Sequence, residues 1–154
     1  MPAATIQFEL EQPATAVDRT TFGPGTCFAS FAEQSRTTFR HATGRLSVIL
    51  APPQEFVAMA PEKVFEVAVR DGNRLGLPMG RVTRYRVITA PEDFYSFAPG
   101  SEPLRPTQRT PIPGLTLAGD YTRQHFLTTM EGAAISGQRA AVAVAEAAET
   151  RKPQ

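Results

Sequence analysis

The chain has 154 residues, enough for one domain of ordinary size or for two partial ones. Hydrophobic residues make up 42% of it and charged residues 20%, which is the composition of a folded globular protein. The formal net charge is +1, from 16 basic and 15 acidic residues, so the charge gives no reason to expect nucleic acid as a partner.

Cysteine and histidine are too few for the common metal and disulfide sites. Cys27 is the one cysteine, and His41 and His125 lie far apart, so we predict no metal centre and a structural role for both histidines. No apolar run approaches the ~20 residues of a bilayer span, and the start of the sequence lacks the pattern of a signal peptide. We expect a protein that is not secreted, either cytoplasmic or peripherally associated with a membrane.

The first part of the chain predicts a mostly antiparallel sheet. Ile6, Phe8 and Leu10 alternate with polar residues, which is the period of a half-buried strand, and Pro13 ends the pattern. Further strands are predicted over residues 27–34, 44–53 and 81–91, with a turn over 22–26 and a hairpin connection over 35–44.

One helix and one proline-rich segment complete this part. Residues 61–76 place apolar side chains at helical spacing, and Pro61 and Glu62 suit the first turn of a helix. Residues 99–113 contain five prolines, which predicts an extended connector. A plain linker and a rigid crossing between two domains fit this composition equally well.

Residues 115–149 predict a short strand, a Gly-Asp turn and a long helix. Thr128 and Glu131 have the spacing of a capping box, so we expect Glu131 to cap the helix rather than to catalyse. Small residues repeat every four positions, in two neighbouring rows: Gly132, Ser136 and Ala140, and Ala133, Gly137 and Ala141. They indicate tight packing on a neighbour, a flat ligand against the first turn, or both. One strand and one helix cannot bury both of their faces, so this unit needs a parallel sheet from elsewhere.

The turn between this strand and helix has the chemistry of a nucleotide site. Asp120 follows the predicted strand, where ligands bind in open α/β sheets, and its carboxylate can accept hydrogen bonds from sugar or ribityl hydroxyls. Gly119 would let the backbone approach a ligand closely, and the helix start presents free N–H groups. A flavin nucleotide needs such an acceptor and such donors, although generic α/β turns also end in Gly-Asp.

Three motifs in this region carry a family resemblance: "GDYT" at 119–122, "MEGA" at 130–133 and "SG" at 136–137. With the proline-rich "LRPTQRTPIPG" before them, they resemble the C-terminal segment of plant- and cyanobacterial-type phytoene desaturases, which are FAD-dependent members of the amine-oxidase-like superfamily. Amine oxidases of that superfamily usually have Glu where Asp120 stands. The resemblance continues upstream in "LSVILAPPQEFV" and "RYRVITAPEDFYSFAPG".

The resemblance implies a mixed α+β and α/β fold. It assigns residues 1–100 to a substrate-binding domain with an antiparallel sheet, 101–114 to a proline-rich crossover, and 115–150 to the last βα unit of an FAD-binding domain. The strands around Ile6 and Val48 could then wall an apolar channel or form ordinary sheet core.

The resemblance also implies the cofactor site. Asp120 would contact the ribityl–pyrophosphate part of FAD, and the backbone around Met130 would face the isoalloxazine carbonyl edge. Tyr121 and Thr122 would lie near the junction of flavin and substrate. The full predicted set is Gly119, Asp120, Tyr121, Thr122, Met130, Glu131 and Gly132. No catalytic acid or base is predicted.

One departure from the family matters. The G-x-G-x-x-G fingerprint is missing, since "GPGTCFA" at 23–29 lacks its spacing and opens no helix. We therefore expect the C-terminal part of a longer enzyme, inactive alone, which shares FAD with an N-terminal segment or subunit and acts on an apolar polyene such as phytoene, at a membrane surface. Two alternatives stay open: a related flavoenzyme acting on another isoprenoid or an amine, and a non-catalytic remnant or interaction module.

Overall fold

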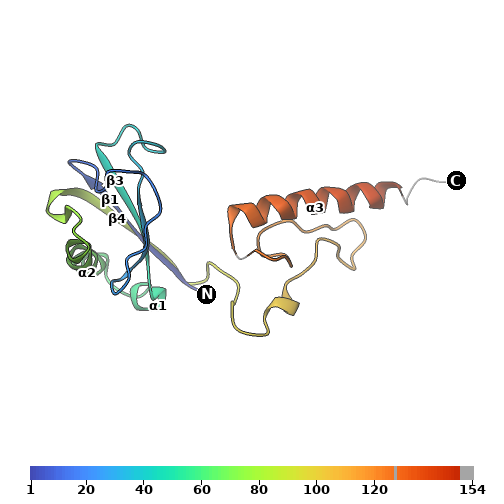
Figure 1. Ribbon diagram of the computed structural model, residues 1–154. Coiled ribbons are helices and arrows are strands. Elements are labelled where there is room, and N and C mark those ends of the chain that lie inside the picture. The colour runs from blue at the N-terminus through green and yellow to red at the C-terminus, as the bar shows by residue number, and fades with distance from the viewer. Residues whose placement is uncertain (127, 150–154) are drawn as a thin grey trace. The chain divides into compact units, whose positions relative to one another are not determined.

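A computed structural model of the chain describes residues 1–126 and 128–149. The chain divides into two compact units, Met1–Asp93 (unit 1) and Phe94–Gln154 (unit 2). Figure 1 shows the sheet of unit 1 and the single long helix of unit 2.

Unit 1 is built on a four-stranded antiparallel sheet with the strand order β2-β3-β1-β4. Its elements are β1 (Ala3–Leu10), β2 (Phe28–Glu33), β3 (Gly44–Leu50), α1 (Pro53–Phe56), α2 (Pro61–Arg74), the 3-10 turn η1 (Met79–Arg81) and β4 (Val82–Ala90). The four strands, the helix and the hairpin connection expected from the sequence are all confirmed, because each rests on a strong local period or on a proline.

The core of unit 1 lies between one face of the sheet and the two helices. Ile6 and Phe8 of β1 and Val48 of β3 are fully buried, together with Val64 of α2. The apolar sides of β1 and β3 therefore form ordinary core and do not wall a channel. The opposite face carries the alternate residues of the same strands, which are half-buried or exposed.

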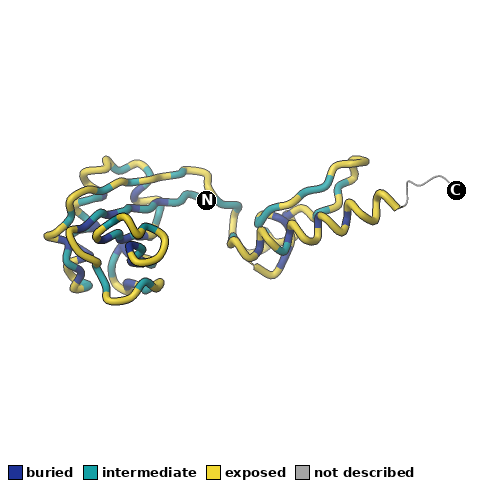
Figure 2. The backbone as a smooth tube through the Cα atoms, turned by 90° about the horizontal axis from the view of Figure 1, so that it is seen from above, coloured by how far each residue is buried: buried dark blue, intermediate teal, exposed yellow. Residues whose placement is uncertain are grey.

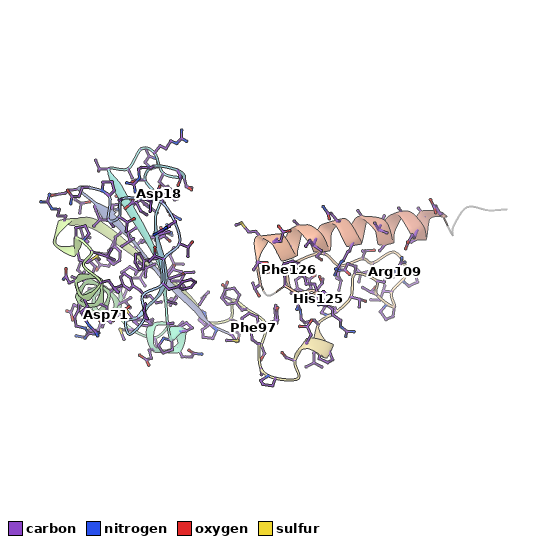
Figure 3. The ribbon with its side chains drawn as sticks, viewed as in Figure 1. Asp18, Asp71, Phe97, Arg109, His125 and Phe126 are labelled. Atoms are coloured by element: carbon purple, nitrogen blue, oxygen red, sulfur yellow. The ribbon has the colours of Figure 1, made fainter. Side chains whose placement is uncertain are left out.

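A buried acid joins α2 to the start of β2. The carboxylate of Asp71, labelled in Figure 3, accepts the backbone N–H of Cys27 at 2.8 Å. Burial would raise the pKa of Asp71, but the hydrogen bonds from Cys27 and Arg70 outweigh it and lower that pKa. Burial, with the neighbouring Asp71 carboxylate, raises the pKa of the Cys27 thiol to about 12, so this thiol is an inert structural group.

Unit 2 contains the 3-10 turn η2 (Glu102–Leu104) and α3 (Met130–Glu149). The segment predicted as a strand from residue 115 forms no strand among the described residues: Thr116 makes a single antiparallel bridge with Arg109, and Leu117 donates its N–H to the carbonyl of Gln108. A strand needs a neighbour along its length, and the described residues of unit 2 offer this segment only that one short edge.

The start of α3 also differs from the prediction. The Thr129 hydroxyl accepts the N–H of Gly132 at 3.0 Å, so Thr129 is the N-cap residue, whereas the hydroxyl of Thr128 is buried without a partner among the described residues. The predicted Thr128–Glu131 capping box is therefore wrong. The helix has its N-cap one residue later than predicted, so Gly132 occupies the third helical position, where a capping box has Glu or Gln.

Only one side of α3 is covered. Gly132, Ser136, Ala140 and Ala143 are buried, while the second row of small residues is exposed, as the yellow outer side of this helix in Figure 2 shows. Among the described residues, no helix has the length and hydropathy to cross a bilayer.

Candidate functional site

The Gly119–Thr122 turn is shaped by a glycine in a backbone conformation that other residues rarely adopt. Gly119 has a φ of +148°, and a Cβ added there would run into the ring of Tyr121. Its N–H donates to the hydroxyl of Ser136 on α3 at 3.0 Å. The lack of a side chain at Gly119 thus makes room for the ring of Tyr121, a residue of this chain, and not for a ligand.

A buried hydroxyl network fastens this turn to α3. Thr122 and Ser136 are both fully buried, with their oxygens 2.7 Å apart. Thr122 donates to the carbonyl of Gly119 at 2.8 Å, so Ser136 must donate to Thr122. The amide of Gln108 donates to both hydroxyl oxygens, which ties the proline-rich segment to the same point.

Arg105 holds the loop that runs from the turn toward α3. Its guanidinium is buried and donates to the carbonyls of Tyr121, Gln124, Asp120 and Phe126, and it pairs with Glu102 at 2.8 Å. The ring of Tyr95 lies 4.7 Å from the guanidinium carbon. All of its donors are directed at fixed acceptors, so a single side chain shapes residues 120–126.

This scaffold leaves the side chain of Asp120 available. Arg105 and Gln124 bond to the backbone carbonyl of Asp120, while its half-buried carboxylate makes no hydrogen bond or ion pair with the described residues. Beyond the loop, Met130 and Glu131 are exposed at the start of α3, where helix N–H groups lack acceptors within the helix.

The seven predicted site residues therefore fall into two groups. Among the described residues, Asp120 is half-buried and Tyr121, Met130 and Glu131 are exposed, so a ligand could reach all four side chains. Gly119, Thr122 and Gly132 serve the architecture of the turn and the cap through bonds within the chain. The cofactor-binding role of the set remains a prediction.

Two further features lie beside the turn. A shallow, mainly apolar cavity of about 200 Å³ is bounded in part by Tyr95, Leu104 and Tyr121. The side-chain oxygen of Gln124 is buried next to the turn and has no partner among the described residues. His125 and Phe126, labelled in Figure 3, lie in the loop that leads to α3 and are exposed.

Sequence reasoning missed Arg105 and Gln108. Both stand in the proline-rich segment, which was expected to be only a connector. Nothing in the local pattern signals a buried arginine there, because its acceptors are backbone carbonyls 15 to 21 positions away. Among the described residues, no three His, Cys, Asp or Glu side chains gather as metal ligands.

The sequence model of the family described as flavin containing amine oxidoreductase matches residues 1–145. The chain belongs to this family. Among individual relatives of this chain, a 15-cis-phytoene desaturase from Solanum lycopersicum is 30% identical over 139 residues, covering 84% of the chain and 24% of the relative. A probable zeta-carotene desaturase from Synechococcus elongatus is 38% identical over 126 residues, covering 79% and 26% respectively.

A third relative, a 15-cis-phytoene desaturase from Synechococcus elongatus, is 26% identical over 153 residues, covering 94% of the chain and 32% of the relative. The expected resemblance to plant and cyanobacterial carotene desaturases is thereby confirmed. The chain spans about a quarter to a third of the length of these relatives.

Proposed function

We propose that this flavin amine oxidoreductase chain is the C-terminal part of an FAD-dependent carotene desaturase. It acts on a carotenoid precursor such as phytoene when joined by a dinucleotide-binding segment. The observation that carries the proposal is the Asp120 carboxylate, which has no partner among the described residues and stands on a turn that three other side chains fix in place. The similarity to carotene desaturases gives the substrate class.

The accessible groups fit a flavin nucleotide in their chemistry. Asp120 offers acceptor oxygens for ribityl hydroxyls, and the exposed first turn of α3 offers backbone N–H donors for a carbonyl edge. Tyr121 presents an exposed aromatic ring beside the turn. When bound, the flavin supplies the redox chemistry, taking up the electrons that leave the polyene as a double bond forms.

The chain's own residues contribute position and an apolar environment. Arg105 and Ser136 keep the turn rigid, so that Asp120 is presented in one orientation. The apolar cavity bounded by Tyr95 and Leu104 suits a substrate with no polar group. Because such a substrate dissolves in lipid, we further propose that the complete enzyme binds a membrane surface peripherally.

The burial pattern of unit 2 supports the proposal that another segment packs against it. Among its described residues, the buried hydrophobic ones are only Ala140 and Ala143, and the other buried groups are polar. Large apolar side chains are exposed instead: Phe97, Leu104, Ile112, Leu115, Tyr121, Phe126, Met130, Val142 and Val144. A unit with a polar interior and an apolar surface is what remains when a neighbouring part of one core is absent.

The test is reconstitution with the N-terminal, dinucleotide-binding part of a related carotene desaturase. We expect the pair to retain FAD, measured by its visible absorbance per complex, and the chain alone to retain none. The Asp120→Asn substitution should weaken FAD binding about tenfold, because one charge-assisted hydrogen bond is lost. Asp93→Asn, at an exposed position of unit 1, is the matched control and should leave flavin binding unchanged.

The same pair separates the substrate classes. Incubation with phytoene in vesicles should give a more conjugated carotene, and incubation with amines should give no product. Unchanged flavin binding in Asp120→Asn would remove the cofactor assignment, and amine turnover without phytoene turnover would remove the substrate assignment.

A further inference from the structure

A second candidate site lies on the open face of the unit 1 sheet and is built from residues of unit 1 alone. Three arginines, Arg45 of β3 and Arg84 and Arg86 of β4, line one cavity of about 280 Å³ together with Gln7 and Glu9 of β1. The register explains why they meet, since Glu9 pairs with both Arg45 and Arg84, and Gln7 pairs with Arg86.

Arg45 is held in place by its neighbours. Its guanidinium donates to Glu9 at 3.0 Å and to Gln7 at 2.5 Å, and it lies 4.4 Å from the centre of the Phe39 ring. Its side chain is only 16% exposed. Arg45 therefore holds a fixed position at one side of the cavity, and Glu9 largely neutralises its charge.

Arg84 and Arg86 are different, because they are exposed and have no acidic partner among the described residues. Two residues apart on one strand, they project from the same face of the sheet. Tyr85 between them turns to the core and stacks on Phe65 at 4.3 Å, which fixes the direction of both arginines. With one carboxylate against three guanidinium groups, the cavity has a charge of about +2.

We propose that this cavity binds a phosphate-bearing anion, with Arg84 and Arg86 as its principal ligands. Guanidinium groups bind phosphate oxygens through paired, charge-assisted hydrogen bonds, and two of them side by side suit an anion with several oxygens. Glu9 lowers the affinity, since its carboxylate repels the anion while it orients Arg45. The site is independent of the proposed flavin function, because all its groups belong to unit 1.

The test is a calorimetric titration of the full chain with inorganic pyrophosphate at constant ionic strength. We expect saturable binding that Arg84→Gln combined with Arg86→Gln weakens at least about tenfold, by loss of two charge-assisted contacts. Arg19→Gln combined with Arg40→Gln makes the same change of net charge at exposed positions outside the cavity, and should leave binding within about twofold. Glu9→Gln should tighten binding severalfold, an effect opposite to that of a merely damaged fold.

A parallel arm identifies the source of the phosphate. Sedimentation with phosphatidylcholine vesicles, with and without phosphatidic acid, tests a lipid headgroup against the free anion. Binding to pyrophosphate, or to the acidic vesicles alone, supports the site if the Arg84 and Arg86 variants lose it and the control does not. The proposed site is overturned if both double variants lose binding equally, or if neither pyrophosphate nor the acidic vesicles bind. It is also overturned if Glu9→Gln weakens binding.

Discussion

Glu33, at the end of β2, shows how one buried charge fastens the loops of unit 1 to its sheet. The side chain is buried, and its oxygens accept the backbone N–H groups of Ala14 at 2.6 Å, Ser35 at 3.0 Å and Arg45 at 2.8 Å. Burial would raise the pKa of Glu33, but the hydrogen bonds donated to it outweigh burial and lower that pKa.

This lowered pKa predicts a loss of stability in acid. The folded chain holds the Glu33 proton less tightly than the unfolded chain, so unfolding takes up protons as the pH falls. The stabilisation is present above the ordinary carboxyl pKa of about 4 and is lost below it. Asp71, whose pKa is also lowered, adds to the loss in the same direction.

The Glu33→Gln substitution tests this at neutral pH and in acid. An amide cannot accept from all of these N–H donors, so we expect the free energy of unfolding to fall by about 2–3 kcal/mol, with a weaker dependence on pH. Urea unfolding followed by circular dichroism measures both. Glu66→Gln removes a charge whose ion pair with Lys63 is exposed on both sides, and should change the free energy by less than about 1 kcal/mol. Equal effects of the two substitutions would contradict this role of Glu33.

At the scale of elements, α3 depends on its N-cap more than most helices do. Its described contacts bury only one narrow side, so tertiary packing contributes little to its stability. The capping hydroxyl of Thr129 satisfies the N–H of Gly132, in the first turn.

Thr129→Ala should therefore lower the stability of α3 by about 1 kcal/mol, the usual effect of a lost cap. Thr128→Ala is the matched comparison, because it removes a hydroxyl that has no partner among the described residues and should not destabilise the helix. Hydrogen exchange at the amides of Gly132 and Ala133 measures the difference. If Thr128→Ala destabilised the helix more than Thr129→Ala, the capping box that the sequence predicted would be correct after all.

The sequence predicted elements well where one local period decides them and poorly where a partner decides them. The strand containing Ile6 and the helix starting at Pro61 follow from alternation, helical spacing and proline position alone. The strand expected at residue 115 needs a neighbouring strand, which no local pattern can supply. For the candidate site, the motif located the turn, but the buried role of Thr122 depends on Gln108 and Ser136, whose contacts with it are made only in the folded chain.

For the whole molecule, the outer side of α3 gives the clearest support for our proposal that another part completes unit 2. Small or apolar residues recur there at spacings of four and three, and all are exposed: Met130, Ala134, Gly137, Ala141, Val144 and Ala148. This is the pattern of a helix that meets another element along its length. Gly137 is the informative member, because a Cβ added to it would meet nothing within 4 Å among the described residues.

A glycine inside a helix is less stable than alanine by about 0.5–1 kcal/mol, so Gly137 needs a reason that the isolated chain does not contain. If the dinucleotide-binding segment packs closely on this side, Gly137→Ala should stabilise the chain alone and weaken its affinity for that segment. Gly137→Leu should weaken it further, because the larger side chain keeps the two backbones apart.

Arg139→Leu introduces the same side chain on the opposite side of the helix, about 200° away, and should leave the affinity unchanged. Thermal unfolding of the chain and calorimetric titration with the segment measure the two effects, and the expected signature is their opposite sign. If Gly137→Ala stabilises the chain and the complex equally, this side of α3 faces solvent in both, and the partner docks elsewhere.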